Sequence, residues 1–379
     1  MSTRGSVLKA LEENKGAAIS GEELANRLSI SRAAIWKAIQ ELRREGYRID
    51  AITNKGYCLA TDSDVLSTEG ILPYLNVDSI PVTGNPATIT GDFAMATGSM
   101  ADRIHVFKSV ESTNLTAKKM ALDGATAGTV VIAEEQTKGR GRMGRSFYSP
   151  PAGGIYMSFI LAPRFDVSKS VLITTAASVA VCRAIEETTG ISCRIKWVND
   201  IYKGEKKICG ILTEAVTDFE SGHIEYIVLG IGINYNTPRS AFPENISVVA
   251  GSLFEDSPTG PDSEDVCNTA LHGINKQGTR NRLIAEVINQ VMAINERLES
   301  RDFIPEYKRR SLVLGKDILI IPAAGPDGER DLEAGIPAAA VDIDGDGGLV
   351  VRHADGRLQT LNTGEISIRT RRQHVQTDR

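Results

Sequence analysis

Three strand-like segments with very short connections constrain the fold of this chain more than any other feature. Residues 191–198, 207–214 and 224–233 are rich in apolar and β-branched side chains, and turn residues at 199–200 and 203–204 separate the first two. A crossover between parallel strands needs a dozen or more residues, so strands joined by such short turns must be antiparallel. The pattern predicts antiparallel pairing within the mixed sheet of an α+β domain.

The flanking regions supply further elements for that sheet. Residues 104–110, 130–135 and 155–161 predict strands, whereas the long apolar run at 168–188 and the periodic segment at 280–300 predict helices. Two stretches interrupt this pattern, about 77–103 and 254–278, and both carry the Gly, Pro and polar residues expected of insertions. We expect a linker at residues 63–103, with a short helical piece at 70–75.

The N-terminal segment has the helix-capping and turn residues expected of a winged helix-turn-helix. Residues 6–14, 21–28 and 32–45 predict helices, because apolar residues recur at helical spacing and a Ser-Gly-Glu-Glu capping box at Ser20 opens the second one. Strands predicted at 47–52 and 56–59 would form the wing.

The charge of this segment differs from the rest of the chain. Residues 1–60 hold ten Lys and Arg against seven Asp and Glu, which gives a net charge of +3. The whole chain has a net charge of −5, so the remaining residues carry −8. A local basic excess favours nucleic acid, and five side chains of the third helix could face a DNA groove. These are Arg32, Trp36, Lys37, Gln40 and Arg43. A solvated helix face and a small protein-binding module are the alternatives.

Short strands alternate with turns from residue 312 to the end of the chain, which predicts a small β-barrel. The strand-like segments are residues 318–321, 339–343, 349–351, 358–361 and 366–369. Asp342, Asp344, Asp346 and Gly347 resemble the start of an EF-hand loop, but His353 occupies the twelfth position, where glutamate is needed. We therefore predict a hairpin turn there.

Composition narrows the class of protein. The 379 residues, 41% hydrophobic and 24% charged, suffice for two or three domains with their own cores. The five cysteines lack a C-x-x-C pair, so neither a disulfide framework nor a zinc site is implied, no metal site built from protein ligands is predicted, and a reducing cytoplasm is favoured. Thr174, Thr175 and Arg183 interrupt the longest apolar segment, which predicts a buried helix and no membrane partner.

A basic, glycine-rich loop is the main candidate for chemistry. Residues 138–145 read Lys-Gly-Arg-Gly-Arg-Met-Gly-Arg; glycine lets backbone N–H groups approach an anion, and guanidinium groups fit phosphate or carboxylate. Residues 139–144 match the dinucleotide fingerprint G-x-G-x-x-G, but a turn-like Ser-Phe-Tyr-Ser-Pro-Pro follows where that motif needs a helix. Gly315-Lys316 is no Walker A loop, because Asp317 stands where Ser or Thr would bind magnesium. A solvated basic loop is the alternative.

The empty loop is expected to be mobile. Ordering residues 139–145 costs roughly 7–14 kcal/mol at about 1–2 kcal/mol per residue. Three charged hydrogen-bonding groups return only about 5–9 kcal/mol. We therefore expect ligand binding to order the loop.

Further polar residues lie in or beside the predicted sheet. Lys196 and Lys207 flank one predicted hairpin, and a strand lysine is costly unless it meets an anion or lies at a sheet edge. Gly210 and the run from Gly230 to Asn234 suggest close approach of a ligand or another backbone. Ser112, Thr113 and Asn114 precede a predicted helix, where they could bind an anion or simply cap the helix.

The order of these motifs resembles biotin protein ligases, and together with the helix-turn-helix it resembles the bifunctional ligases that also repress biotin synthesis. The resemblance rests on Glu-Ser-Thr-Asn at 111–114, Gln136, the 139–145 loop, Lys-Trp-Val-Asn-Asp at 196–200, Lys-x-x-Gly-Ile-Leu at 207–212, Gly-x-Gly-Ile-Asn at 230–234 and Gly-Glu-Ile-Ser at 364–367. Val198 departs from the proline usual in this family, and Phe147 from the tryptophan of some members.

The resemblance implies a multidomain α+β architecture with four parts. These are a winged helix-turn-helix at residues 1–62, a linker at 63–103, a mixed-sheet catalytic domain related to class II aminoacyl-tRNA synthetases at 104–311, and an SH3-like barrel at 312–379. It also implies a cytoplasmic enzyme that uses ATP, Mg²⁺ and biotin to make biotinyl-5′-AMP and then biotinylates a lysine of biotin carboxyl carrier protein. Operator DNA would be a second partner, bound by a homodimer with the adenylate as corepressor.

The resemblance also assigns roles by motif position. Lys207 and Arg142 would be catalytic, and biotin or its adenylate would contact Ser112, Thr113, Asn114, Gln136, Arg140, Gly141, Arg142 and Lys207. Lys196, Gly210 and Asn234 are further candidate contacts. A lipoate ligase and a repressor that binds an acyl-adenylate without making it are the alternative functions.

Overall fold

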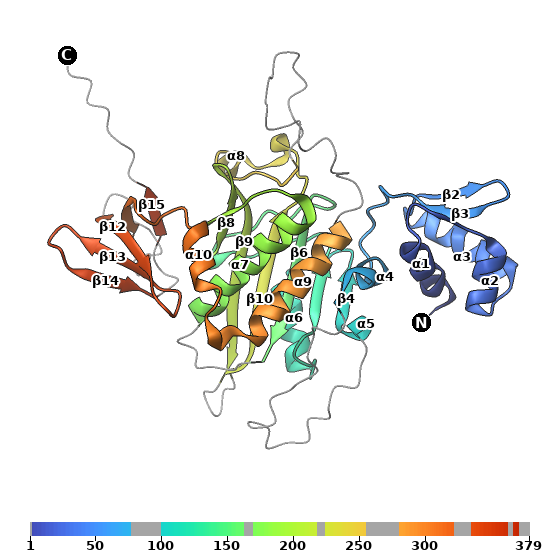
Figure 1. The fold of residues 1–379 in the computed structure, drawn as a ribbon, viewed down its shortest axis with the longest axis horizontal. Helices are drawn as coiled ribbons and strands as arrows, with labels where there is room; N and C mark the ends of the chain where they lie inside the picture. Colours follow the sequence, from blue (N-terminus) through green and yellow to red (C-terminus); the bar gives the residue numbers. More distant parts are fainter. Residues whose placement is uncertain are drawn as a thin grey trace, which may run out of the picture.

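Three separate β-sheets organise the computed structural model, and the largest lies between the other two (Figure 1). The structure describes residues 2–76, 100–162, 170–217, 224–254, 280–321, 335–362 and 367–370. Most of the two predicted insertions and the Gly-Glu-Ile part of the 364–367 motif lie outside these ranges.

The N-terminal unit is a helix-turn-helix with a small wing, as predicted. It comprises α1 (Thr3–Glu13), α2 (Gly21–Leu28), α3 (Arg32–Arg44) and a three-stranded sheet of β1 (Ala18–Ile19), β3 (Gly56–Leu59) and β2 (Ile49–Ile52). Ser20 and Ser31 cap α2 and α3, since each hydroxyl accepts a hydrogen bond from the backbone N–H three residues on. The first helix begins earlier than predicted because Ser2 caps it in the same way.

The central sheet is mixed, as predicted, with strand order β4-β5-β6-β10-β9-β8-β7. Its strands are β4 (Ile104–Phe107), β5 (Val130–Ala133), β6 (Gly154–Leu161), β7 (Arg194–Lys196), β8 (Asp200–Lys203), β9 (Lys206–Thr217) and β10 (Ile224–Asn234). Only β4 and β5 pair in parallel among the described strands, and every other neighbouring pair is antiparallel.

One predicted pairing in this sheet is wrong. The strand expected at 191–198 is shorter, and its partner is β8 rather than the strand that Lys207 opens. The cause is the four-residue strand β8, which fits between the turns at 197–199 and 204–205 and is too short to give a periodic pattern. Lys196 therefore lies in an edge strand, two strands away from Lys207.

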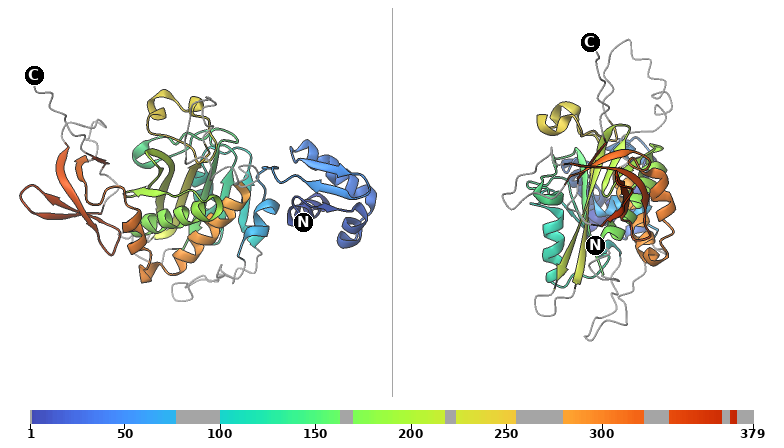
Figure 2. Two further views of the ribbon diagram at one scale, coloured as in Figure 1. Left: turned by 45° about the horizontal axis from the view of Figure 1, so that its top comes forward. Right: turned by 90° about the vertical axis from the view of Figure 1, so that its left-hand side faces the viewer.

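Helices cover both faces of the central sheet (Figure 2). α7 (Ser170–Thr189), α9 (Arg280–Glu296) and α10 (Ile304–Arg310) lie on one face, and α6 (Thr113–Leu122) lies on the other. Alternate residues of β10 serve the two faces: Ile227 and Leu229 join the core with α7 and α9, while Tyr226 and Val228 pack with α6. No helix among the described residues is both long and apolar enough to span a membrane.

The C-terminal strands form an antiparallel sheet of order β14-β13-β12-β11-β15. They are β11 (Asp317–Ile321), β12 (Ile336–Ile343), β13 (Leu349–His353), β14 (Leu358–Leu361) and β15 (Ser367–Thr370). The described strands do not include a β14–β15 pair that would close a barrel. The hairpin turn predicted at Asp344 is confirmed, because its carboxylate accepts hydrogen bonds from the N–H groups of Asp346 and Gly348.

The segment after the wing packs on the central domain. It contains α4 (Thr68–Ile71) and a 3₁₀ turn (Leu72–Tyr74), which confirms the short helical piece. Leu66 and Ile71 belong to the core that α7 and α9 share. Arg280 of α9, 5% exposed, pairs with Asp64 at 2.6 Å and with Glu134 at 2.9 Å. The first part of the predicted linker is therefore tied to the sheet.

Candidate active site

A cavity of about 180 Å³ lies between the N-terminus of α6, the 139–147 loop and the central strands β9 and β10. Nearly all predicted site residues of the catalytic domain line it: Ser112, Thr113, Asn114, Gln136, Arg140, Gly141, Arg142, Lys196, Lys207 and Gly210. Asn234 does not, because its amide points away and donates to the Gly251 carbonyl at 3.0 Å.

Glycines form the floor of the cavity. Gly230 and Gly232 follow Tyr226 and Val228 on the same face of β10. The face that packs under α6 therefore carries no side chains at these two positions. Gly232 is paired with Gly210 of β9. A side chain on Gly230 would overlap Asn114 Oδ1, and one on Gly232 would lie 2.7 Å from the Phe147 ring. The prediction was close approach of a ligand or another backbone, whereas the approaching groups in the structure are side chains of this chain.

The polar residues at the start of α6 hold one another in place. Gln136 Oε1 accepts from the Thr113 backbone N–H at 2.9 Å and from its hydroxyl at 3.1 Å. Ser158 Oγ lies 2.8 Å from Thr113 Oγ1 and 2.7 Å from Asn114 Oδ1. The simple capping alternative for Ser112 is wrong, because its side chain makes no capping hydrogen bond although it occupies the N-cap position.

The basic loop folds as a small hairpin over the cavity. Phe147 N–H donates to the Gly139 carbonyl at 2.9 Å and Gly141 N–H to the Arg145 carbonyl at 2.7 Å. Met143 and Gly144 form its tip in the left-handed region, at φ 60° and 72°. These two backbone hydrogen bonds favour the closed loop. The comparison of the loop's ordering cost with three charged hydrogen bonds did not include them, so the mobility of the empty loop stays a prediction.

Arg142 of the loop is hydrogen-bonded to the turn between β7 and β8. Arg142 Nη1 donates to Asn199 Oδ1 at 2.7 Å. Burial lowers the pKa of the Arg142 guanidinium, while the nearby Asp200 carboxylate opposes the shift. Arg142 stays charged near neutral pH, since arginine has so high a pKa.

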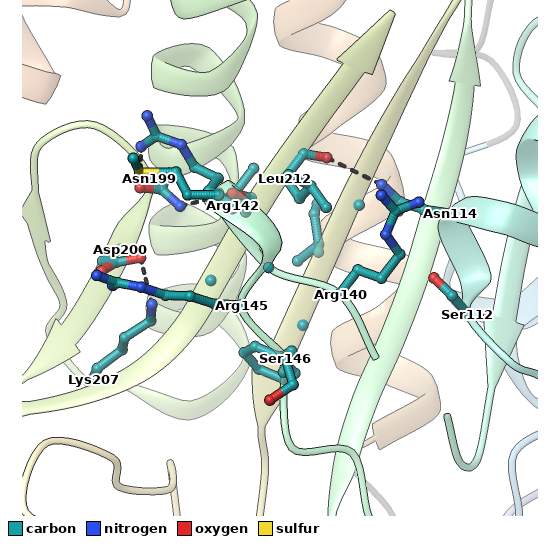
Figure 3. Close-up of a pocket in the computed structure, with 18 of the residues that line it drawn as sticks. Ser112, Asn114, Arg140, Arg142, Arg145, Ser146, Asn199, Asp200, Lys207 and Leu212 are labelled. Carbon is teal, nitrogen blue, oxygen red and sulfur yellow. Dashed lines mark hydrogen bonds and ion pairs between the residues drawn. The ribbon is translucent and has the colours of Figure 1, made fainter. Parts of the chain in front are cut away.

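Cations dominate the other end of the cavity. Lys207 Nζ lies 2.6 Å from Asp200 Oδ1, and both side chains are about a quarter exposed. Figure 3 shows Arg142, Arg145 and Lys207 gathered at this end, with Ser112, Asn114 and Arg140 at the other. Among the described residues, the cavity lining holds five cationic side chains (Arg140, Arg142, Arg145, Lys196 and Lys207) against the single carboxylate of Asp200. Such a lining favours a ligand with several negative charges.

Comparison with known proteins decides the family. A model of the biotin/lipoate A/B protein ligase family matches residues 106–234, an HTH-domain model matches residues 4–58 and a model of the biotin protein ligase C-terminal domain matches residues 336–369. The bifunctional ligase/repressor BirA of Bacillus spizizenii is 37% identical over 239 residues, which cover 63% of this chain and 67% of that protein. This chain belongs to the BirA family of bifunctional ligase/repressors.

Two further BirA proteins and a solved biotin protein ligase are also similar to this chain. The Bacillus subtilis BirA is also 37% identical, over 62% of this chain and 66% of its own length, just under two thirds. The Escherichia coli BirA is 27% identical over 93% of each chain. The solved biotin protein ligase of Aquifex aeolicus, in complex with biotin and ATP, superimposes with a TM-score of 0.55 and 26% identity, covering 71% of this chain and 99% of that one.

Glu214 of β9 lies beside the cavity, contacts two of its predicted residues and was missed by the sequence-based prediction. Its carboxylate accepts from Asn114 Nδ2 at 2.8 Å and Lys118 Nζ at 2.7 Å, and Arg140 lies 3.7 Å away. Burial alone would raise the pKa of Glu214, but the hydrogen bonds from Lys118 and Asn114 outweigh it and hold the pKa below the ordinary value. The one sequence signal was a lone carboxylate in a largely apolar strand.

The helix-turn-helix of this BirA-family chain presents most of its predicted DNA-binding residues outward. Arg32, Trp36 and Lys37 are exposed on α3, Trp36 at 58%. Gln40 and Arg43 are half-buried. Arg43 Nε donates to the Ile49 carbonyl at 2.9 Å, so part of this side chain holds the wing strand β2.

Proposed function

We propose that this BirA-family chain condenses biotin with ATP and then transfers the biotinyl group to a lysine of biotin carboxyl carrier protein. The observation that carries the proposal is the two-ended cavity, with hydroxyl and amide groups near α6 and cations near β9. A neutral ureido ring needs hydrogen-bonding groups, whereas a carboxylate and a triphosphate held together need cations.

The α6 end would bind the biotin ring. Ser112, Thr113, Asn114 and Gln136 offer hydroxyl and amide groups there, and Arg140 with Gly141 would close over the ring from the loop. Because Thr113, Gln136 and Ser158 already bond to one another, their positions are set before a ligand arrives.

The cationic end would support the first chemical step. An oxygen of the biotin carboxylate attacks the α-phosphorus of ATP, the bond from that phosphorus to the bridging oxygen breaks, and pyrophosphate leaves. Lys207 and Arg142 would stabilise the negative charge on the α-phosphate during this step, with Lys196 as a further contact. In the second step the uncharged amine of a carrier-protein lysine attacks the carbonyl carbon of the mixed anhydride. The C–N bond forms, the bond from that carbon to the phosphate oxygen breaks, AMP leaves, and the nitrogen loses a proton to solvent.

Magnesium would assist the departure of pyrophosphate by neutralising its charge. Mg²⁺ is usually bound by one or two carboxylates together with substrate phosphates. Asp200 fits that requirement: its Oδ1 is buried and makes no hydrogen bond of good geometry, despite the ion-pair contact with Lys207.

The N-terminal unit would make the same chain a repressor of biotin synthesis. Arg32, Trp36, Lys37 and Gln40 would enter the major groove of operator DNA, with Arg43 also supporting the wing. A single unit of charge +3 makes few phosphate contacts, so we propose that a homodimer holding biotinyl-5′-AMP is the form that binds DNA tightly. The same proposal includes a synthetase-like catalytic domain, an SH3-like C-terminal barrel and a cytoplasmic location.

A substrate comparison tests the enzyme proposal. Purified protein is incubated with ATP and Mg²⁺ together with either biotin or lipoate, and pyrophosphate release is measured. Release with biotin alone is expected. Release with lipoate alone would favour a lipoate ligase, and release with neither would favour a sensor that binds an adenylate made elsewhere.

A further inference from the structure

A short segment of the cavity wall, Trp197–Asn199, is fixed from two sides. The Trp197 indole N–H donates to the Gly347 carbonyl in the β12–β13 turn at 2.9 Å, and the Tyr307 hydroxyl donates to the Val198 carbonyl at 3.2 Å. Asn199 faces the cavity at the end of this segment. The C-terminal sheet and α10 therefore support the segment that ends in Asn199, the residue that contacts the loop.

The amide of Asn199 has its orientation determined by its partners. Nδ2 donates to the Ile211 carbonyl at 2.8 Å, and the Ile211 N–H donates to the Asn199 carbonyl at 3.0 Å. A carbonyl can only accept, so Oδ1 must point the other way, toward Arg142. It accepts from Arg142 Nη1 at 2.7 Å.

The chemistry of an amide suits a reversible contact here. Arg142 is half-buried, so an unpaired guanidinium would be costly, and a neutral oxygen satisfies one donor while leaving its full positive charge for a ligand. A carboxylate at this position would neutralise that charge and compete with phosphate.

We propose that Asn199 is the latch of the basic loop: a positioning residue that holds the loop closed over the adenylate through its contact with Arg142. The role rests on the proposed function as far as the adenylate is concerned. The Asn199–Arg142 contact joins two residues of the protein itself, so loop closure can be measured by a readout that needs no ligand.

The first experiment measures retention of biotinyl-5′-AMP after a single turnover. Asn199→Ala is expected to shorten retention roughly tenfold to a hundredfold, the range for loss of one charged hydrogen bond. Asn199→Asp should raise the KM for ATP, because its carboxylate neutralises Arg142, and it also removes the amide donor to the Ile211 carbonyl. Asn236→Ala, an exposed asparagine outside the cavity lining, is the matched control and should behave like the parent.

A double-mutant cycle distinguishes an effect of Asn199 that acts through Arg142 from an independent effect on the structure of the site. If Asn199 acts through Arg142, combining Asn199→Ala with Arg142→Ala should release adenylate no faster than the faster single variant. Fully additive effects, or parent-like retention by Asn199→Ala, would overturn the latch.

Limited trypsin digestion supplies a readout that needs no ligand. The loop offers Lys138, Arg140, Arg142 and Arg145 as cleavage sites, and Asn199→Ala should be cut there faster than the parent or Asn236→Ala. Parent-like cleavage would overturn the latch even if adenylate forms. Faster cleavage in a protein that makes no adenylate would support the latch and refute only the proposed function.

Discussion

Most polar atoms near α6 are engaged with other residues of this chain. Asn114 accepts from Ser158 through its oxygen and donates to Glu214 through its nitrogen, and Gln136 accepts twice from Thr113. Single residues here therefore act partly by positioning their neighbours. Lys207 differs, because the one ion-pair partner of its ammonium group among the described residues is the Asp200 carboxylate, which substrate phosphates or a cation could replace.

Lys207→Ala is expected to slow adenylate formation about a hundredfold or more, since one donor to developing charge is typically worth roughly 2.7–4 kcal/mol. Pyrophosphate release measured under single-turnover conditions checks this. Lys206→Ala is the matched control, because Lys206 Nζ donates to the Val248 carbonyl outside the cavity. A parent-like rate for Lys207→Ala would transfer the role to Lys196.

At the scale of elements, the basic hairpin and the start of α6 enclose the cavity from opposite sides. The hairpin is held by the contact of Arg142 with Asn199 in the β7–β8 turn, and α6 is held by the contacts of Asn114 and Lys118 with Glu214 of β9. Removing the Arg142 contact should affect retention of the adenylate, whereas removing the Glu214 contacts should affect the stability of the fold.

Arg142→Gly should leak the intermediate more than it slows its formation, because the hairpin loses its anchor while Lys207 remains. The fraction of biotinyl-5′-AMP retained after one turnover is the measurement. Lys138→Gly, at an exposed loop lysine paired with Glu111, should retain adenylate like the parent. Equal retention by Arg142→Gly would mean that loop closure does not hold the intermediate.

The contacts of Glu214 should stabilise the fold in a pH-dependent way. Its pKa in the folded protein is below the ordinary value of 4.5, so its contribution is fully present above the pKa of the unfolded chain and disappears as the pH falls through the lower folded value. The stability difference between the parent and Glu214→Gln, measured by denaturant unfolding, should be constant near neutral pH and shrink only below about pH 4.5. A difference independent of pH would contradict the ion-pair account.

At the scale of the whole molecule, Arg280 connects the segment after the wing to the catalytic sheet. It pairs with Asp64 on one side and with Glu134 on the other, two residues before Gln136 of the cavity. The helix-turn-helix and the site are thus joined by a short, largely buried set of contacts.

Arg280→Met should lower the free energy of unfolding by about 2–3 kcal/mol, below the 3–5 kcal/mol of a fully buried pair because both carboxylates keep about a quarter of their surface exposed. In a Trp36→Phe background the fluorescence of buried Trp197 reports on the central domain, and circular dichroism reports on the helices of the whole chain; these are the two signals compared. Their unfolding transitions should move apart in Arg280→Met. Arg48→Met, which removes a surface pair with Asp62, should change stability by about 1 kcal/mol at most.

Operator binding should be tight only when biotinyl-5′-AMP occupies the catalytic domain. If ordered loops add dimer surface, adenylate and DNA must favour each other's binding by the same factor. A DNA titration at fixed salt compares apoprotein, protein with biotin, and protein with biotin and ATP, with sedimentation of the same samples. Equal affinity in all three, or tight binding by a monomer, would refute this coupling and leave the ligase assignment intact.

The sequence by itself determined the features that depend on a few neighbouring residues. Serine caps defined the helix-turn-helix, and short turns required antiparallel strands. The order of the loop, the Ser-Thr-Asn segment and the strand lysines carried the resemblance to the family, and that resemblance implied ten of the cavity residues. Backbone preferences and turn chemistry act over only a few positions, so a linear pattern records them directly.

The tertiary structure alone decided which side chains meet. Strand β8, the Glu214 cluster, the Asn199–Arg142 contact, the Gly347 support behind Trp197 and the Arg280 pairs each depend on strand register or on packing between segments far apart in the chain. A one-residue change of register would turn Glu214 and Gly230 to the opposite face of the sheet. No local pattern encodes that register, because it is set by how all the strands and helices bury their apolar faces together.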